Sequence, residues 1–326
     1  MNERSEPRIC LAPLRGLTGA IFRNTYAEFF DGIDWAVTPF LTTIAGTRLK
    51  ASQLKEVLPE NNRLMPIVPQ ILSKTADRFI TLSKALFDLG HGTVNWNLGC
   101  PFAKVAKKMR GSGLLPHPDL IDAFLEAVFK KIPNQLSIKT RLGRRQPDEF
   151  FKLIPVFNRY PIKEIIIHPR TGEQMYTGRV DLDVFEQCLA SLRADVIYNG
   201  DVNEVRDFKA LQARFPALST WMIGRGVLAN PYLPVMIKGR GAPGGIDCLD
   251  RFRRFHDTLF ERYAAVRHGP VHLADSMKGY WGYFAGAFCD GAHLLKQIRK
   301  VHGAAQYQEV VQRFFDGADP ECCFTF

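Results

Sequence analysis

The chain has 326 residues, of which 46% are hydrophobic and 23% are charged, the composition of a globular protein with a full core. Lys and Arg outnumber Asp and Glu by 43 to 33, and the net charge of +10 favours a polyanionic partner, because each neutralised phosphate releases counterions. The seven cysteines are scattered without C-x-x-C spacing, which argues against a disulfide framework or a zinc site. We therefore expect a reducing, cytoplasmic setting and no metal.

The first element predicted along the chain is a strand, and no long apolar segment precedes it. The opening stretch MNERSEPRICLAP thus predicts neither a signal peptide nor a membrane anchor. Short apolar runs, eight in all, indicate buried parallel strands at residues 8–13, 35–40, 65–72, 94–99, 136–143, 164–170, 195–201 and 220–226. Most of the gaps carry segments with helical periodicity, as at 74–90, 118–132 and 203–215.

Eight alternating strand–helix units are the number that closes a (β/α)8 TIM barrel. The competing α/β architecture, an open doubly wound sheet, would place a glycine-rich dinucleotide turn after its first strand. The stretch 11-LAPLRGLTG is a poor match to G-x-G-x-x-G. The sequence therefore predicts an α/β protein built on a TIM barrel.

The pattern changes after 237-IKGRGAPGGID, a Gly/Pro-rich stretch of the kind that separates domains. The segments that follow, such as 251–269 and 292–303, are helical in periodicity and rich in aromatic residues. We predict a catalytic barrel domain over residues 1–240 and an all-α helical-bundle domain over residues 246–326.

Polar or otherwise special residues cluster at the C-terminal ends of the predicted strands, the rim where TIM barrels hold their active sites. These residues are Pro13, Gln70, Asn97, Cys100, Lys139, Arg141, His168, Arg170, Asn199, Asp201 and Arg225. The last two strands end in 198-YNGD and 223-IGRG, where glycine lets a phosphate approach the backbone and Arg225 can add a charge-assisted contact. Two such turns at consecutive strand ends favour a phosphorylated cofactor over ordinary glycine turns.

Lys139 ends the fifth strand, where an ammonium group without a partner would be costly to bury. An electron-rich flavin ring is a suitable partner, because a nearby cation stabilises its reduced, anionic form. His168 taken alone is more often a hydrogen-bonded polar residue of the core. Beside Lys139, Gln70 and the two glycine turns, it is predicted to contact the cofactor.

Cys100 lies between Gly99 and Pro101, and the loop continues into Lys104, Lys107, Lys108 and Arg110. An apolar pocket is not expected there, although a free cysteine is most often a small buried hydrophobe. With an ordinary pKa of about 8.5 the thiol stays mostly protonated at neutral pH and can act as a general acid. Cationic neighbours are expected to lower that pKa, so the residues alone leave the roles of acid and nucleophile open.

In order along the chain, the motifs are 11-LAPL, 97-NLGCP, 139-KTR, 168-HPRTGEQMYTG, 199-NGD and 223-IGRGVLANP. With this ordered set the chain resembles the tRNA-dihydrouridine synthases over the whole barrel. The segment after residue 246, including 277-MKGYWGYF, is similar to the RNA-binding domain of that family, though more loosely.

The resemblance implies an FMN prosthetic group, NADPH as reductant, and a uridine of the tRNA D-loop that is reduced at its C5=C6 bond. By motif, Cys100 would protonate C5 while the reduced flavin delivers hydride to C6. The flipped-out uracil would be held by Asn97, Arg141 and Arg170. The cofactor would be held by Pro13, Leu14, Gln70, Lys139, His168, Asn199, Gly200, Asp201, Gly224 and Arg225.

A tRNA partner would lie across a basic face formed by residues 104–110 and the C-terminal helices. The helical residues of this face are Arg251, Arg253, Arg254, Lys296, Arg299 and Lys300. For any one of them, a solvated charged surface is an equally good interpretation. No membrane and no protein partner are implied, and we expect a monomer.

Three stretches depart from the family pattern. The first strand carries Leu14 in place of the usual Met, 144-RRQP replaces the acidic or aromatic residues that often follow K-x-R-x-G, and 113-GLLPHP replaces a stretch that commonly contains Lys-Asp-Pro. None removes a predicted catalytic group. Two other functions remain as alternatives, an FMN barrel oxidoreductase acting on a free pyrimidine and a non-catalytic RNA-binding protein. The basic loop 104–110 argues against the first, and the retained Cys100 and glycine turns argue against the second.

Overall fold

The computed structural model describes residues 6–43, 54–241, 245–267 and 270–324. Within these residues, parallel strands form one sheet with the order β3-β5-β6-β7-β8-β9-β10-β1-β2-β4. The strands are β1 (Arg8–Leu11), β2 (Trp35–Val37), β3 (Leu41–Thr42), β4 (Ile67–Val68), β5 (Gln70–Leu72), β6 (Thr93–Leu98), β7 (Gln135–Gly143), β8 (Glu164–Thr171), β9 (Asp195–Asn199) and β10 (Thr220–Ile223). Each lies within or beside a predicted apolar run.

The sheet closes into a barrel because β2 and β3 follow each other in the chain, as do β4 and β5, and the two segments pair on both sides of their breaks. The strand predicted at 35–40 contains β2, and β3 begins just past its predicted end, whereas the strand predicted at 65–72 contains both β4 and β5. β2 pairs with β4 and β3 pairs with β5, while β1 pairs with both β2 and β10, so the ring is continuous. Pro39 and Pro69 lie at the two breaks, because proline has no N–H to donate to the ladder.

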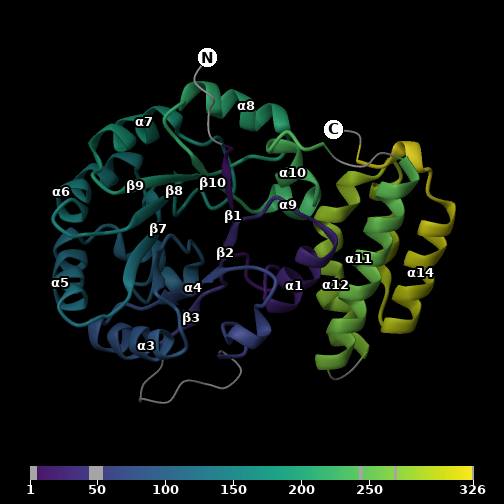
Figure 1. Ribbon diagram of the computed structural model, residues 1–326, viewed down its shortest axis with the longest axis horizontal. Coiled ribbons are helices and arrows are strands. Elements are labelled where there is room, and N and C mark those ends of the chain that lie inside the picture. Colours follow the sequence, from purple (N-terminus) through teal and green to yellow (C-terminus); the bar gives the residue numbers. More distant parts are fainter. Residues whose placement is uncertain (1–5, 44–53, 242–244, 268–269, 325–326) are drawn as a thin grey trace.

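Helices surround the barrel (Figure 1). Those outside the C-terminal segment are α1 (Ala20–Phe29), α3 (Ala76–Asp88), α4 (Ala103–Ala106), α5 (Pro118–Phe129), α6 (Ile154–Phe157), α7 (Leu182–Ser191), α8 (Val205–Arg214), α9 (Arg225–Ala229) and α10 (Leu233–Ile237). Short 3-10 turns lie at η1 (Pro59–Asn61), η2 (Gly111–Leu114) and η3 (Pro147–Lys152). Burial of apolar helix faces against the strands makes the main core, where Trp96 stacks on Phe124 with ring centroids 3.9 Å apart.

The C-terminal segment is helical, and Figure 1 shows it as a layer at one side of the barrel, next to α1. Its elements are α11 (Gly245–Val266), α12 (Pro270–Phe284), η4 (Ala285–Ala287), α13 (Gly291–Lys300), α14 (Ala304–Gly317) and η5 (Pro320–Cys322). The predicted fold, a TIM barrel followed by a helical region, is therefore confirmed. None of the described helices combines the length and the apolar character needed to cross a membrane.

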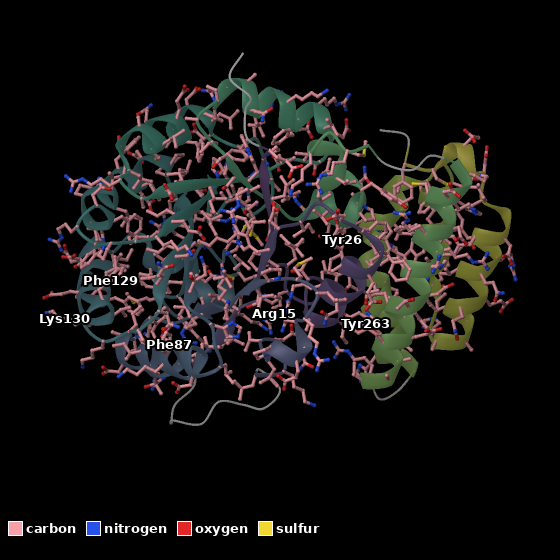
Figure 2. The ribbon with its side chains drawn as sticks, viewed as in Figure 1. Arg15, Tyr26, Phe87, Phe129, Lys130 and Tyr263 are labelled. Atoms are coloured by element: carbon pink, nitrogen blue, oxygen red, sulfur yellow. The ribbon has the colours of Figure 1, made fainter. Side chains whose placement is uncertain are left out.

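Aromatic side chains join this layer to the barrel. Phe255 of α11 packs edge-on against Phe22 and Phe30, with ring centroids 6.0 and 5.0 Å away. Tyr263 and Tyr280 share a hydrogen bond of 2.8 Å between their hydroxyl groups. Figure 2 labels Tyr26 and Tyr263 along this border. The core is thus continuous across the predicted boundary at residues 240–246, and the division into two domains stays a prediction.

Candidate active site

A cavity of about 460 Å³ opens at the C-terminal ends of the strands. Its volume lies within the range of small-molecule and cofactor sites. The predicted site residues that line it are Pro13, Leu14, Gln70, Asn97, Cys100, Lys139, Arg141, His168, Asn199, Gly200, Asp201, Gly224 and Arg225. Arg170 is the predicted site residue that does not reach the lining. The structure therefore brings together strand ends that are far apart in sequence, at the edge where TIM barrels hold their active sites.

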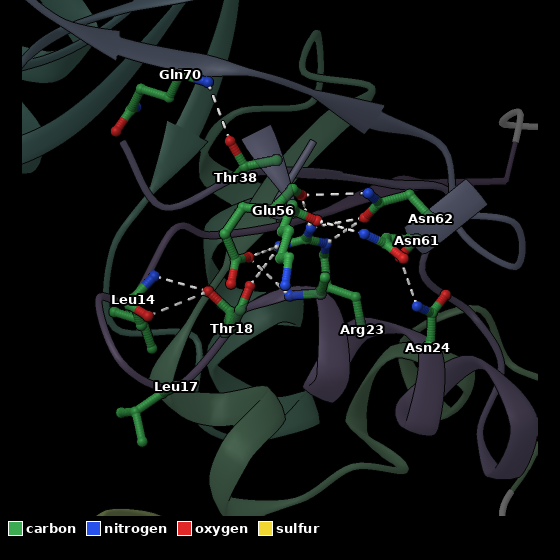
Figure 3. Close-up of polar contacts among 12 residues, drawn as sticks. Leu14, Leu17, Thr18, Arg23, Asn24, Thr38, Glu56, Asn61, Asn62 and Gln70 are labelled. Atoms are coloured by element: carbon green, nitrogen blue, oxygen red, sulfur yellow. Dashed lines mark hydrogen bonds and ion pairs between the residues drawn. The ribbon is translucent and has the colours of Figure 1, made fainter. Parts of the chain in front are cut away.

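The turn after β1, residues 12–18, is the first segment of the rim. The hydroxyl group of Thr18 accepts a hydrogen bond from Leu14 N (2.8 Å) and donates one to the Ala12 carbonyl (3.0 Å). Below it, the buried Arg23 donates to the Thr18 carbonyl (2.7 Å) and to Asn62 Oδ1 (2.6 Å), as Figure 3 shows. Burial lowers the pKa of Arg23 to about 10. This satisfied guanidinium holds the turn that carries Pro13 and Leu14 to the cavity.

A chain of buried amide groups forms one wall of the cavity. Gln70 Nε2 donates to Asn95 Oδ1 at 2.7 Å, and Asn95 Nδ2 donates to Ser137 Oγ at 2.6 Å. Asn97 Nδ2 donates to Gln70 Oε1 at 2.7 Å, and Asn97 Oδ1 accepts from the backbone N–H of Cys100 at 2.9 Å. Since each buried amide has a partner, the side chains of Gln70 and Asn97 are held in one orientation.

The Cys100 loop is clamped through its backbone. The Cys100 carbonyl accepts hydrogen bonds from Ser112 N (3.1 Å) and Ser112 Oγ (3.0 Å). Gly111 has a φ of +55°, and a Cβ there would lie 2.8 Å from the Cβ of Cys100. Arg144 Nη1 contacts both the Pro101 carbonyl and Ser112 Oγ at 3.3 Å. Arg144, in the stretch that departs from the family pattern, therefore braces the loop that carries the thiol.

The environment of the thiol differs from the sequence prediction. Cys100 is buried, with 6% of its surface exposed, although an apolar setting was not expected in this basic loop. Burial raises the pKa of Cys100, while the N–H of Phe102 and the charges of Arg141 and Arg15 lower it by less. The expected lowering by cations is therefore outweighed, because removing the thiolate from water costs more than these charges return. The thiol is protonated at neutral pH.

Lys139 and Arg141 project from β7 into the cavity. Lys139 Nζ donates to Asn199 Oδ1 at 2.6 Å, and burial followed by the charge of Arg141 lowers the pKa of Lys139 to about 7. Arg141 Nη1 donates to the Thr171 carbonyl at 2.7 Å. Burial lowers the pKa of Arg141 to about 10, which leaves it charged at neutral pH. A ligand with negative charge at this place would gain from both side chains.

Arg170 lies behind the cavity wall and acts through Asp201. Its Nη1 and Nη2 donate to the two carboxylate oxygens of Asp201 at 2.9 and 2.5 Å. Nη1 also contacts Nε2 of His168 at 3.1 Å, which makes that ring nitrogen the acceptor. Burial and the surrounding charges hold the pKa of His168 well below its ordinary value, so the imidazole is neutral. Arg170 thus orients two of the lining residues.

Tyr176 was not predicted, although it lies within the motif 168-HPRTGEQMYTG. Its ring is 5.4 Å from the guanidinium carbon of Arg141 and 5.1 Å from that of Arg225, and it lines the cavity. Arg225 Nη2 also donates to Asp201 Oδ1 at 2.8 Å. The signal that could have identified Tyr176 was an aromatic residue within an arginine-containing motif, because guanidinium groups pack on aromatic faces.

The arrangement fits a planar cofactor with a phosphate. Turns rich in glycine follow β9 and β10, and a Cβ on Gly226 would lie 2.1 Å from the Val202 carbonyl, so only glycine allows this approach of the two turns. Arg225 stands beside them with its side chain 33% exposed, which leaves it accessible to an anion. Lys139 and Gln70 line the same cavity. The lining thus offers donors both to an anionic group and to a polar ring.

The C-terminal helices reach the rim. Tyr283 of α12 lines the cavity, and the hydroxyl group of Tyr280 donates to the Leu17 carbonyl at 2.5 Å. On α11, the predicted basic residue Arg253 pairs with Asp316 at 2.8 Å and Arg254 lies 4.0 Å from Asp250. Those two charges are therefore partly neutralised within the layer.

Comparison with solved structures identifies the class of fold. The chain is similar to morphinone reductase, with a TM-score of 0.53 and 11% identity over 74% of this chain and 91% of that one. It is also similar to the old yellow enzyme homologue from Zymomonas mobilis, with a TM-score of 0.54 and 13% identity over 72% and 89% of the two chains. At this identity the likeness establishes a shared TIM-barrel fold.

The family follows from the sequence. The profile of the dihydrouridine synthase (Dus) family matches residues 10–279, and the chain belongs to that family of oxidoreductases. Among its relatives are the probable tRNA-dihydrouridine synthase of Rhizobium leguminosarum bv. phaseoli, 27% identical over 96% of this chain and 98% of the relative, and the tRNA-dihydrouridine(16) synthase of Pseudomonas putida, 24% identical over 93% and 96%. The resemblance predicted from the motifs is confirmed.

Proposed function

We propose that this protein is a flavin-dependent tRNA-dihydrouridine synthase that reduces the C5=C6 bond of a D-loop uridine. The observation that carries the proposal is the protonated, enclosed thiol of Cys100 in the same cavity as Lys139 and Arg141. The names of the relatives and the basic charge of the chain support tRNA as the substrate class. A tRNA substrate agrees with the expected cytoplasmic location, and we propose a monomer.

FMN is the proposed prosthetic group and NADPH the proposed reductant; FMN, when bound, would supply the hydride for C6 of the uracil. Arg225 and the backbone of the turns at 199–201 and 224–226 would hold its phosphate. Lys139, Gln70 and His168 would contact the ring or the ribityl chain, with Pro13 and Leu14 beside the ring. Each of these side chains and turns lines the cavity, which supports the proposal.

The uracil would be held by Arg141 and Asn97, and Arg170 would act from behind the wall by orienting Asp201 and His168. Cys100 donates its proton to C5, and the raised pKa keeps that proton available at neutral pH. The N–H of Phe102 and the charges of Arg141 and Arg15 then stabilise the thiolate that remains. Residues 246–326 are proposed as a separate tRNA-binding unit, in which the exposed Lys296, Arg299 and Lys300 of α13 contact phosphates.

The test is to incubate the purified protein with NADPH and unmodified tRNA and to map dihydrouridine by mass spectrometry of the digested RNA. We expect dihydrouridine at a D-loop position and none without NADPH. A protein that binds and reduces flavin but forms dihydrouracil only from the free base would contradict the tRNA assignment.

A further inference from the structure

Phe102 is an exposed aromatic side chain at the mouth of the cavity. It is 47% exposed, lines the cavity and follows Cys100 by two positions. The other exposed large aromatic residues within the described part of the chain are Phe87 and Tyr176. Tyr176 packs on two guanidinium groups, whereas Phe102 makes no ring or cation contact with any residue that the structure describes. A ring that is left half-exposed beside the reacting thiol has apolar area to offer a ligand.

The backbone presents this ring in a fixed position. The Phe102 carbonyl accepts hydrogen bonds from Val105 N at 2.8 Å and Ala106 N at 2.9 Å. Pro101, which precedes it, is buried and has a restricted φ. Because the backbone is already ordered, a ligand that packs on the ring loses little conformational entropy of the protein.

Lysines without a carboxylate partner in the described part of the chain follow Phe102 within the next six residues. Lys104, Lys107 and Lys108 are exposed, and across the described residues none of them has a carboxylate within 4.0 Å. An aromatic ring with unpaired lysines beside it is the composition of surfaces that bind single-stranded nucleic acid, where bases stack and phosphates meet the cations.

We propose that Phe102 is a stacking site for the nucleobase adjacent to the reduced uridine in the bound RNA. This inference rests on the proposed function. The uridine must leave its stack to reach Cys100, and its neighbour then loses a stacking partner. Phe102 stands at the rim rather than at the thiol itself, so it can cover the exposed face of that neighbour. Stacking there offsets part of the cost of flipping the uridine.

The experiment compares Phe102→Ala, Phe102→Leu and Phe102→Tyr in the full-length, flavin-loaded protein with unmodified tRNA. Stacking on an aromatic residue contributes about 1–3 kcal/mol per base, so the KM of Phe102→Ala should rise about 5- to 150-fold with little change in kcat. Phe102→Tyr should restore the wild-type KM, and Phe102→Leu should fall between. A tRNA with 2-aminopurine beside the target uridine should lose fluorescence on binding to wild type and Phe102→Tyr but not to Phe102→Ala.

Phe87→Ala is the matched control, because Phe87 is 45% exposed but lies on α3, outside the cavity lining (Figure 2). Its KM should not change. If wild type reduces tRNA and Phe102→Ala has the same KM, the stacking site is overturned and the proposed function stands. If wild type binds flavin but reduces no tRNA, both are overturned. A change in sedimentation of Phe102→Ala without a change in KM would overturn the site in favour of a protein contact.

Discussion

The two walls of the cavity are built on different principles. The amide wall, formed by Gln70, Asn97 and the Cys100 loop, is neutral and internally hydrogen-bonded, and the buried Asn95 supports it by accepting a hydrogen bond from Gln70. The cationic wall is formed by Lys139, Arg141, His168, Asp201 and Arg225. Arg170 lies behind it, so that two guanidinium groups, those of Arg170 and Arg225, share the carboxylate of Asp201. The polar groups of the amide wall already have hydrogen-bond partners. The cationic wall carries more positive charge than its one carboxylate can neutralise.

The difference indicates two tasks. Satisfied buried amides resist rearrangement, since any new orientation would leave a polar group without a partner. The amide wall is therefore suited to hold the thiol of Cys100 in one position. The cationic wall lowers the pKa of its own Lys139 through burial and mutual repulsion, and an anionic ligand would relieve that cost. It is therefore suited to receive a cofactor.

Replacing the thiol should have the largest effect on the rate of tRNA reduction. It should leave flavin binding, the task assigned to the cationic wall, unchanged. In Cys100→Ala, oxidation of pre-reduced flavin by unmodified tRNA should slow about 10²- to 10⁴-fold, as expected for loss of a general acid. Flavin content and flavin reduction by NADPH should not change, because neither moves a proton through that side chain. Stopped-flow flavin absorbance measures both steps, and a wild-type rate of oxidation would return Cys100 to a structural role.

Removing the buried amine of Lys139 should raise the stability of the flavin-free protein and weaken flavin binding, two opposite effects of one substitution on the cationic wall. Lys139→Met should stabilise the flavin-free protein by about 1–4 kcal/mol at neutral pH and below, because it removes the cost of a buried charge, while flavin binding weakens. The pKa of Lys139 is about 7 when folded and 10.5 in its ordinary state, so between these values the unfolded wild type binds more protons. The free energy of unfolding of the wild type therefore rises with pH between these values. The amount by which the wild type is less stable than Lys139→Met becomes smaller over the same range.

Urea denaturation of both flavin-free proteins, at one pH below 7 and one near 10.5, measures this difference. A deficit that is the same at both values would contradict the assignment of the cost to the charge of Lys139.

Arg225→Ala should affect only the phosphate end of the cofactor. A charge-assisted hydrogen bond contributes about 1.5–3 kcal/mol, so the Kd for FMN should rise about 10- to 150-fold. The Kd for riboflavin, which lacks the phosphate, should stay at the wild-type value. Titration by flavin fluorescence measures both Kd values. An equal loss of affinity for FMN and riboflavin would show that Arg225 contacts a part of the flavin other than the phosphate.

Loosening the brace on the amide wall should have the smallest effect. Arg144→Met removes one donor, Nη1, that two acceptors of the Cys100 loop share at 3.3 Å. The shared hydrogen bond is expected to contribute about 0.5–1.5 kcal/mol in all, so the rate of Cys100 alkylation should rise about 2- to 12-fold. Arg144→Lys should restore part of the protection. Arg145→Ala is the control, because Arg145 is 76% exposed and pairs only with Glu173 among the described residues. Equal alkylation in all of these proteins would show that the loop is held without Arg144.

The strands and the rim could be predicted from the sequence because both are local features. A short apolar run predicts a buried strand, and a polar residue at its end predicts a place at the rim, as for Gln70 and Asn199. The breaks between β2 and β3 and between β4 and β5 were not predicted, although Pro39 and Pro69 can be seen in the sequence. The pairing on each side of a break depends on the neighbouring strand, which the local sequence does not identify.

Burial and side-chain direction at the site were decided only by the tertiary structure. The loop that carries the buried thiol of Cys100 is held by hydrogen bonds from Ser112, in the segment that follows it, and from Arg144, which comes only after β7. Arg170 points behind the wall because Asp201, in the turn after β9, offers it two oxygens. Tyr176, in the loop after β8, lines the cavity because its ring packs against Arg141 of β7 and Arg225 at the start of α9. The sequence identifies the chemical group at the end of each strand. The hydrogen-bond and packing partners of that group come from other segments, and the closed barrel determines which of these segments lie beside it.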